Sequence, residues 1–227
     1  MLALVGSGEY LPAMEPVDRE LIRRLPSAPR VVCLPTAAGI ESPERIAYWS
    51  RLGVEHFARL GVQVETVPVL NRADANDMAL AAVIAEANFV YLSGGKPDHL
   101  YKTLVDTPVW EAIQAVLGRG GLLAGCSAGA MIMGEKLMGF PARGPGFNLL
   151  PGTVIMPHYD EIPRILALPL SWLGGHNLTL VGIEGNTALV YDGETYEVLG
   201  SGGVTIWNQQ GKTRYTQGRL SELWPGA

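Results

Sequence analysis

The sequence predicts one three-layer α/β domain, in which helices cover both faces of a mostly parallel sheet. Through the first two thirds of the chain, short apolar runs alternate with segments of helix length, as parallel strands and their crossovers do. Beyond residue 179, short apolar runs are separated by Gly, Asn and Asp, a pattern typical of C-terminal antiparallel hairpins. Apolar residues form 48% of the 227 residues, which is enough for a sizeable core.

The individual elements follow from where apolar runs and turn signals lie. Ser42 and Pro43 mark a helix start, and Asp192-Gly193 is the clearest hairpin turn. Strands are expected over 2–5, 30–35, 62–67, 88–92, 122–124 and 153–156. Helices are expected over 15–25, 42–60, 74–87, 97–105, 107–117 and 161–173, with another beginning at residue 128. Without a repeat or linker, residues 1–227 are interpreted as a single domain.

Composition narrows the class of protein. The net charge of −5 and the absence of a basic run argue against nucleic acid as a partner. No apolar stretch reaches membrane-spanning length, and the start MLALVGSGEY is typical of a first strand and not of a signal peptide. Cys33 and Cys126 fall in predicted buried strands, which fits a reducing cytoplasm. No metal-ligand spacing or P-loop is present, so we expect no metal and no cofactor.

The stretch GGLLAGCSAGAMIMG, residues 120–134, predicts a nucleophile elbow. Its centre, Gly125-Cys126-Ser127-Ala128-Gly129, matches G-x-S-x-G between an apolar strand and a small-residue helix. Such a turn raises the Ser127 side chain above the sheet, and the two glycines leave room where strand and helix crowd together. The alternative is a glycine-rich turn with an inert serine.

A serine hydroxyl needs a base, and four histidines are candidates. His158 is favoured because it follows Pro157 at a predicted strand end. His56 is expected on a solvated helix face, His99 is expected to point sideways from its helix, and His176 lies in a polar loop.

A carboxylate should orient the imidazole of the base. The candidates are Glu184, Glu135, Asp160 and Glu161. Glu184 is preferred because it interrupts an apolar strand, where an unpaired charge would be costly. Asp160 is close to His158 in sequence, and Glu135 is expected on the elbow helix. Oxyanion donors are expected from the N–H of Ala128 and from the Gly94-Gly95 loop.

Several stretches together resemble the dipeptidase E and cyanophycinase family of serine peptidases: GCSAGA, LSGGKPDHL, LLPGTVIMPHYDE and VGIEGNTALV. The resemblance implies the flavodoxin-like fold of class I glutamine amidotransferases. It implies Ser127 as nucleophile, His158 as base, and Gly95 and Ala128 as the oxyanion hole. Cyanophycinases take their acid from the GIEGNTA strand, which supports Glu184. Dipeptidase E takes an aspartate after the elbow helix, where residues 138–142 here hold no acid.

The resemblance also implies a substrate, an aspartyl or β-aspartyl small peptide. An acidic group needs a cation, which Lys96 or Arg143 would supply, although either is equally a solvated surface charge. Relatives often carry Asn or Asp with Gln where this chain has Lys96-Pro97-Asp98. This departure at Lys96 and Asp98 puts in doubt which substrate side chain the site prefers.

The resulting hypothesis is a cytoplasmic serine exopeptidase or dipeptidase with a Ser-His-Glu triad, and a homodimer is left open. One rival is an amidotransferase-like domain, which normally needs cysteine at the elbow centre, where Cys126 is one place off. The other is a catalytically silent module on the same fold.

Overall fold

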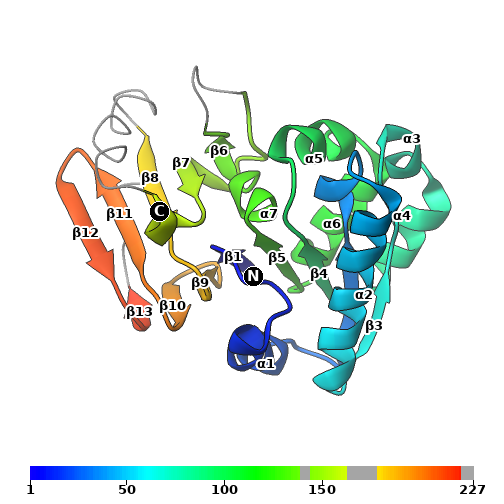
Figure 1. The fold of residues 1–227 in the computed structure, drawn as a ribbon, viewed down its shortest axis with the longest axis horizontal. Helices are drawn as coiled ribbons and strands as arrows, with labels where there is room; N and C mark the ends of the chain where they lie inside the picture. The colour runs from blue at the N-terminus through cyan, green and yellow to red at the C-terminus, as the bar shows by residue number, and fades with distance from the viewer. Residues whose placement is uncertain (139–143, 163–177, 221–227) are drawn as a thin grey trace.

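Two β-sheets form the framework of the computed structural model, which describes residues 1–138, 144–162 and 178–220 (Figure 1). The eight strands of the large sheet run in the order β13-β10-β9-β1-β5-β4-β2-β3. They are β1 (Leu2–Val5), β2 (Arg30–Leu34), β3 (Gln63–Thr66), β4 (Phe89–Leu92), β5 (Leu122–Cys126), β9 (Thr187–Tyr191), β10 (Tyr196–Gly200) and β13 (Gly218–Leu220). The small sheet, in the order β12-β11-β8-β7-β6, is built from β6 (Gly134–Lys136), β7 (Leu150–Met156), β8 (Thr179–Ile183), β11 (Val204–Asn208) and β12 (Gly211–Tyr215).

The helices of the described residues are mostly crossovers between parallel strands. They are α1 (Glu15–Arg23), α2 (Pro43–Arg59), α3 (Arg72–Ala75), α4 (Met78–Ala85), α5 (Pro97–Leu104), α6 (Pro108–Gly118) and α7 (Ala128–Met131), with single 3-10 turns η1 (Pro12–Met14), η2 (Thr36–Ala38) and η3 (Tyr159–Glu161). The backbone N–H of Arg45 donates to the Ser42 hydroxyl, so the expected cap of α2 is present.

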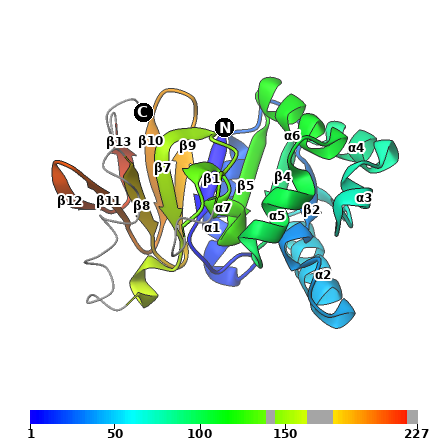
Figure 2. The ribbon, with the colours of Figure 1, turned by 90° about the horizontal axis from the view of Figure 1, so that it is seen from above.

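The large sheet has a parallel centre. Strands β1, β5, β4, β2 and β3 are parallel, whereas β9 and β10 are added antiparallel beyond β1. Alternate side chains of β1 enter different cores, with Leu4 on one face and Val5 on the other. The Val5 face is covered by α1 and α2, and the Leu4 face by α3 to α7 together with the small sheet (Figure 2). The predicted α/β class with a mostly parallel sheet and antiparallel additions is therefore confirmed.

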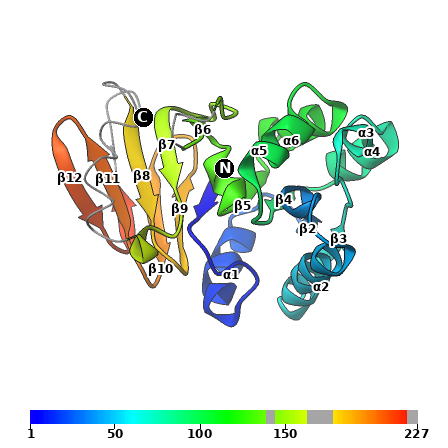
Figure 3. The ribbon, with the colours of Figure 1, turned by 45° about the horizontal axis from the view of Figure 1, so that its top comes forward.

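The small sheet is more than the predicted row of hairpins. Its strands β6, β7 and β8 are parallel to one another, and β11 and β12 continue it antiparallel. The last part of the chain thus serves two sheets, because β8 joins β7 while β9 joins β1 (Figure 3). The sheets meet where Ser7 and Gly185 form a β-bridge. A Cβ on Gly6 would lie 2.1 Å from the Glu184 carbonyl oxygen, so this approach requires glycine.

Two local expectations were wrong. The elbow helix ends at Met131, and Glu135 lies instead on β6, where its carboxylate accepts from the Gly152 N–H at 2.9 Å. His56 is fully buried instead of solvated, and its Nε2 lies 2.8 Å from the Asp18 carboxylate of α1. The expected helix over 161–173 falls largely on residues 163–177, outside the described part.

Removing the buried Asp18 carboxylate should destabilise the fold without disturbing the large sheet. Asp18→Ala leaves the His56 ring buried without its partner, so we expect the free energy of unfolding to fall by about 2–4 kcal/mol. Urea unfolding followed by circular dichroism measures this loss. A change below about 0.5 kcal/mol would contradict a stabilising role for the pair.

Candidate active site

Ser127 has the backbone conformation of a nucleophile elbow. It links β5 to α7 with φ 51° and ψ −108°, a region that non-glycine residues rarely adopt. The flanking glycines are required by space: a Cβ on Gly125 would lie 2.4 Å from the Gly129 backbone, and one on Gly129 would lie 2.5 Å from the Leu92 carbonyl oxygen. The Ser127 side chain is therefore held above the end of the sheet.

His158 reaches Ser127 from the small sheet. It follows β7 after Pro157, and its Nε2 lies 3.3 Å from the Ser127 hydroxyl oxygen. The chain turns at His158 with φ 52°, in the left-handed region, so the ring turns back towards the large sheet. Helix α7 packs against both β5 and β7, which keeps the two strand ends close (Figure 1, Figure 2). The structure thus brings together the two residues that the sequence predicts as nucleophile and base.

The carboxylate beside His158 is Glu161 and not the preferred Glu184. Glu161 Oε1 lies 3.2 Å from the other ring nitrogen, Nδ1. Both side chains are exposed, 41% for His158 and 67% for Glu161, so solvent screens this pair.

Glu184 is engaged elsewhere. It accepts two hydrogen bonds from the Arg214 guanidinium, at 2.6 and 2.7 Å, and one from the Gly203 N–H at 2.9 Å. The Arg214 guanidinium holds the pKa of Glu184 below its ordinary value. Glu184, which directly follows the apolar strand β8, therefore forms an ion pair with Arg214 of β12. In this geometry the described partners of the Glu184 carboxylate are Arg214 and Gly203, and the carboxylate in contact with His158 is that of Glu161.

Asp160 has a different part in the site. Its Oδ1 accepts from the Gly185 N–H at 2.8 Å, which ties η3 to the turn between β8 and β9. The first loop also holds this turn in place, because the Asn186 N–H donates to the Ser7 carbonyl at 3.0 Å. The backbone after His158 is therefore fixed to both sheets.

The two predicted oxyanion donors are available. Ala128 is the first residue of α7, and the first N–H groups of a helix have no intrahelical acceptor. Gly95 has φ 146° and lies against Ala37, whose carbonyl accepts from the Lys96 N–H at 2.8 Å. Within the described ranges, no acceptor is found for the N–H of either Gly95 or Ala128. Such free donors beside a nucleophile suit a developing oxyanion.

The other predicted residues add little evidence about the chemistry of the site. Lys96 is exposed directly after Gly95, Asp98 is half-buried in the first turn of α5, and Arg143 lies outside the described residues. His99 Nε2 contacts the Leu70 carbonyl at 2.8 Å, and His176 also lies outside the described residues. In the described part of the chain, no group of three His, Cys, Asp or Glu side chains is placed as metal ligands would be. No described helix is both long and apolar enough to cross a membrane.

Cys126 is poorly placed to act as a nucleophile. Its side chain is fully buried, and its thiol donates to Glu9 Oε2 at 2.9 Å. Burial and the nearby Glu9 carboxylate raise the pKa of this thiol well above its ordinary value. An amidotransferase-like reaction at Cys126 is therefore disfavoured.

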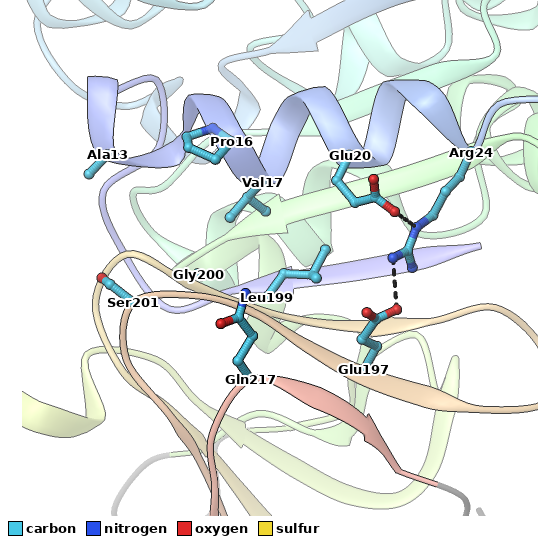
Figure 4. A pocket seen from close by; sticks show the side chains of 10 residues that line it. All are labelled: Ala13, Pro16, Val17, Glu20, Arg24, Glu197, Leu199, Gly200, Ser201 and Gln217. Carbon is cyan, nitrogen blue, oxygen red and sulfur yellow. Dashed lines mark hydrogen bonds and ion pairs between the residues drawn. The ribbon is translucent and has the colours of Figure 1, made fainter.

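A separate surface pocket of about 450 Å³ lies between α1 and β10 (Figure 4). At one end, Arg24 bridges Glu20 and Glu197, and the Arg23 and Arg24 guanidinium groups lower the pKa of Glu20 to about 2. None of its lining residues belongs to the group around Ser127.

One protein-family model matches most of this chain. The model of peptidase family S51 matches residues 2–199. The chain belongs to peptidase family S51. This membership places it in a family of serine-type peptidases and confirms the resemblance seen in the sequence.

Relatives of this S51 chain include cyanophycinases. The Geminocystis herdmanii cyanophycinase is 27% identical over 183 residues, which cover 74% of this chain and 67% of that protein. The Trichormus variabilis cyanophycinase is 31% identical over 165 residues, covering 66% and 55%. The chain thus spans just over half the length of the second protein.

Solved structures extend the likeness over most of the chain. A peptidase from an acI-B1 Actinobacterium is 35% identical with a TM-score of 0.87, over 97% of this chain and 96% of that one. A putative peptidase E protein from Listeria monocytogenes EGD-e is 20% identical with a TM-score of 0.67, over 88% and 98%, and shows the shared fold.

The buried thiols should be inert in the folded protein. Burial raises the pKa of Cys33 to about 12 and that of Cys126 well above its ordinary value, so neither forms thiolate near neutral pH. We expect no alkylation by iodoacetamide at pH 8 under native conditions and reaction of both thiols after denaturation, measured by mass spectrometry. Native alkylation of Cys126 with loss of activity would instead support the amidotransferase-like alternative.

Proposed function

We propose that this chain is a serine peptidase acting on small peptides, with Ser127 as nucleophile, His158 as base and Glu161 as the carboxylate that orients His158. The observation that carries the proposal is the 3.3 Å contact between the strained Ser127 and His158, which come from different sheets. A merely structural serine would not need a left-handed backbone aimed at an imidazole. The match to a solved peptidase over 97% of this chain adds support.

The reaction follows from these positions. Ser127 Oγ attacks the scissile carbonyl, and His158 Nε2 takes the hydroxyl proton. The carbonyl oxygen becomes an oxyanion, which the N–H groups of Gly95 and Ala128 stabilise. His158 then returns the proton to the leaving amine as the C–N bond breaks. A water molecule, deprotonated by His158, hydrolyses the acyl-enzyme and restores the Ser127 hydroxyl.

Glu161 replaces Glu184 in the proposed triad because of contact geometry. The orienting acid has to reach Nδ1, and Glu161 does so at 3.2 Å from the same 3-10 turn. Glu184 would first have to release Arg214 and the Gly203 N–H. Because Glu161 is 67% exposed, its carboxylate is expected to contribute less than a buried triad acid does.

The proposed substrates are aspartyl or β-aspartyl dipeptides. Cyanophycinases are among the relatives, and the chain carries Lys96 immediately beyond the proposed oxyanion donor Gly95. An ammonium at that place would pair with a substrate carboxylate near the cleaved bond.

A cleavage screen over Asp-X, β-Asp-X and uncharged dipeptides tests activity and substrate together. We expect cleavage of acidic dipeptides, with Ser127→Ala lowering kcat by 10³-fold or more because the nucleophile is lost. Retention of full activity by folded Ser127→Ala would contradict the nucleophile assignment.

A matched pair of lysine variants tests the proposed preference for acidic substrates. Lys96→Met should lower kcat/KM for acidic dipeptides by about tenfold while leaving uncharged ones little changed, because one cation pair is lost. Lys102→Met, an exposed lysine on α5, should leave both rates unchanged. Equal effects of Lys96→Met on both substrate classes would contradict recognition of an acidic side chain.

Paired amide variants distinguish the two glutamates. We expect Glu161→Gln to lower kcat by about 10–100-fold, because the amide no longer favours the imidazolium form of His158. Glu184→Gln should change kcat by less than threefold, with some loss of thermal stability as the Arg214 pair weakens. Full pH–rate profiles of both variants provide the measurement. A larger loss in kcat for Glu184→Gln would return the role to Glu184.

A further inference from the structure

Glu9 is a carboxylate buried beside the site that the mechanism so far does not use. It lies in the loop after β1 and is only 8% exposed. Burying a carboxylate costs several kcal/mol unless its oxygens are well bonded. The two oxygens of Glu9 are therefore expected to accept hydrogen bonds.

The two oxygens of Glu9 bind the Gly94-Gly95 loop and the last residue of β5, which directly precedes the nucleophile. Oε1 accepts from the Gly94 N–H at 3.0 Å, and Oε2 accepts from the Cys126 thiol at 2.9 Å. Gly94 precedes the oxyanion donor Gly95, and Cys126 precedes Ser127. One side chain therefore links the first loop to the residue before each reacting element.

The space around Gly94 shows how tight this link is. A Cβ on Gly94 would lie 2.8 Å from Glu9 Oε1 and 3.4 Å from the Ser127 Cβ. The Gly94 backbone thus packs closely against both the buried carboxylate and the nucleophile. A shift of this peptide would also move the N–H of Gly95.

The loop that carries Glu9 has a strained backbone. Gly8 has φ 88° and Tyr10, which is not glycine, has φ 64°, so left-handed residues flank the carboxylate on both sides. Tyr10 is itself buried against Phe57 and Tyr91, which fixes the loop from below. This strain aims Glu9 inward beneath the elbow instead of out into solvent.

We propose that Glu9 is a positioning residue for the reaction: by accepting from the Gly94 N–H, it holds the Gly94-Gly95 loop so that the N–H of Gly95 faces the oxyanion. The proposal rests on the proposed function. Glu9 touches no reacting atom and acts only through the peptide that it anchors. Its length and its acceptor oxygen carry the role, and the negative charge is not required.

The test compares kcat and KM of Glu9→Ala, Glu9→Asp and Glu9→Gln on a cleaved dipeptide. Loss of one oxyanion donor costs about 10²–10³ in kcat, so a loosened donor should cost about 10–100-fold with KM within twofold. Glu9→Asp is too short to reach Gly94 and should lose a similar amount, which keeps the test valid if Glu9→Ala does not fold. Glu9→Gln keeps an acceptor at the same reach and should restore kcat to within about threefold of wild type.

A tetrahedral inhibitor reports on the oxyanion hole directly. A peptide boronic acid bonds to the serine and places an oxygen where the oxyanion forms. Its inhibition constant should rise in Glu9→Ala and Glu9→Asp by about the factor that kcat falls, and should not rise in Glu9→Gln. The matched control is Asp18→Ala, which also removes a buried carboxylate and destabilises the fold, yet should leave kcat within twofold.

Three results would overturn the proposal: kcat of folded Glu9→Ala or Glu9→Asp within twofold of wild type, an equal loss in Glu9→Gln, or an equal loss in Asp18→Ala. Ser127→Ala is measured in parallel. A wild-type protein without Ser127-dependent cleavage would refute the proposed function, whereas intact Ser127-dependent cleavage with unaffected Glu9 variants would refute only the role of Glu9.

Discussion

The packing of the small sheet against the large one is the constraint on which the site depends. Ser127 ends a strand of the large sheet and His158 ends a strand of the small one, so their 3.3 Å contact exists only while the two sheets hold their positions. The sheets are joined where Gly6 lies against the Glu184 carbonyl and Ser7 bridges to Gly185. The same junction receives Asp160, which steadies the turn after His158. One seam therefore aligns both halves of the proposed catalytic pair.

Strained residues gather along this seam. Three non-glycine residues there have a left-handed backbone: Ser127, His158 and Asn186. Each such residue costs of order 1–3 kcal/mol, so the surrounding core has to hold it in place. The Leu4 face supplies that core, since it contains apolar side chains from α4, α6 and both sheets. Stability of the large core thus supports precise placement of a few side chains at its edge.

The sequence predicts the parallel sheet and the elbow because each has a local cause. The elbow needs glycine at Gly129 because its backbone lies against Leu92. One continuous strand-turn-helix pattern in the sequence is enough to predict this elbow. The second sheet could not be predicted, because β8 and β9 have similar apolar patterns but pair with different partners. His56 and Asp18 lie 38 residues apart in the sequence, so no local pattern predicts their pairing.

The carboxylate partners depend on backbone geometry that the sequence does not display. Glu161 reaches His158 only because His158 itself turns with φ 52°, which reverses the chain into a 3-10 turn. Glu184 looked like a buried charge in need of a histidine, but its partner, Arg214, comes from a strand 30 residues later. In the sequence, Glu9 is visible only as an acid after Gly6-Ser7-Gly8, and its partners come from a distant loop and the end of a distant strand.

The most direct test of the central claim is covalent labelling of the native protein by a fluorophosphonate, with the adduct located by peptide mass spectrometry. The sheet-to-sheet pairing of Ser127 and His158 predicts one phosphonyl group on Ser127, formed at least 100-fold more slowly in folded His158→Gln. An adduct elsewhere, or an unchanged rate in His158→Gln, would contradict the account.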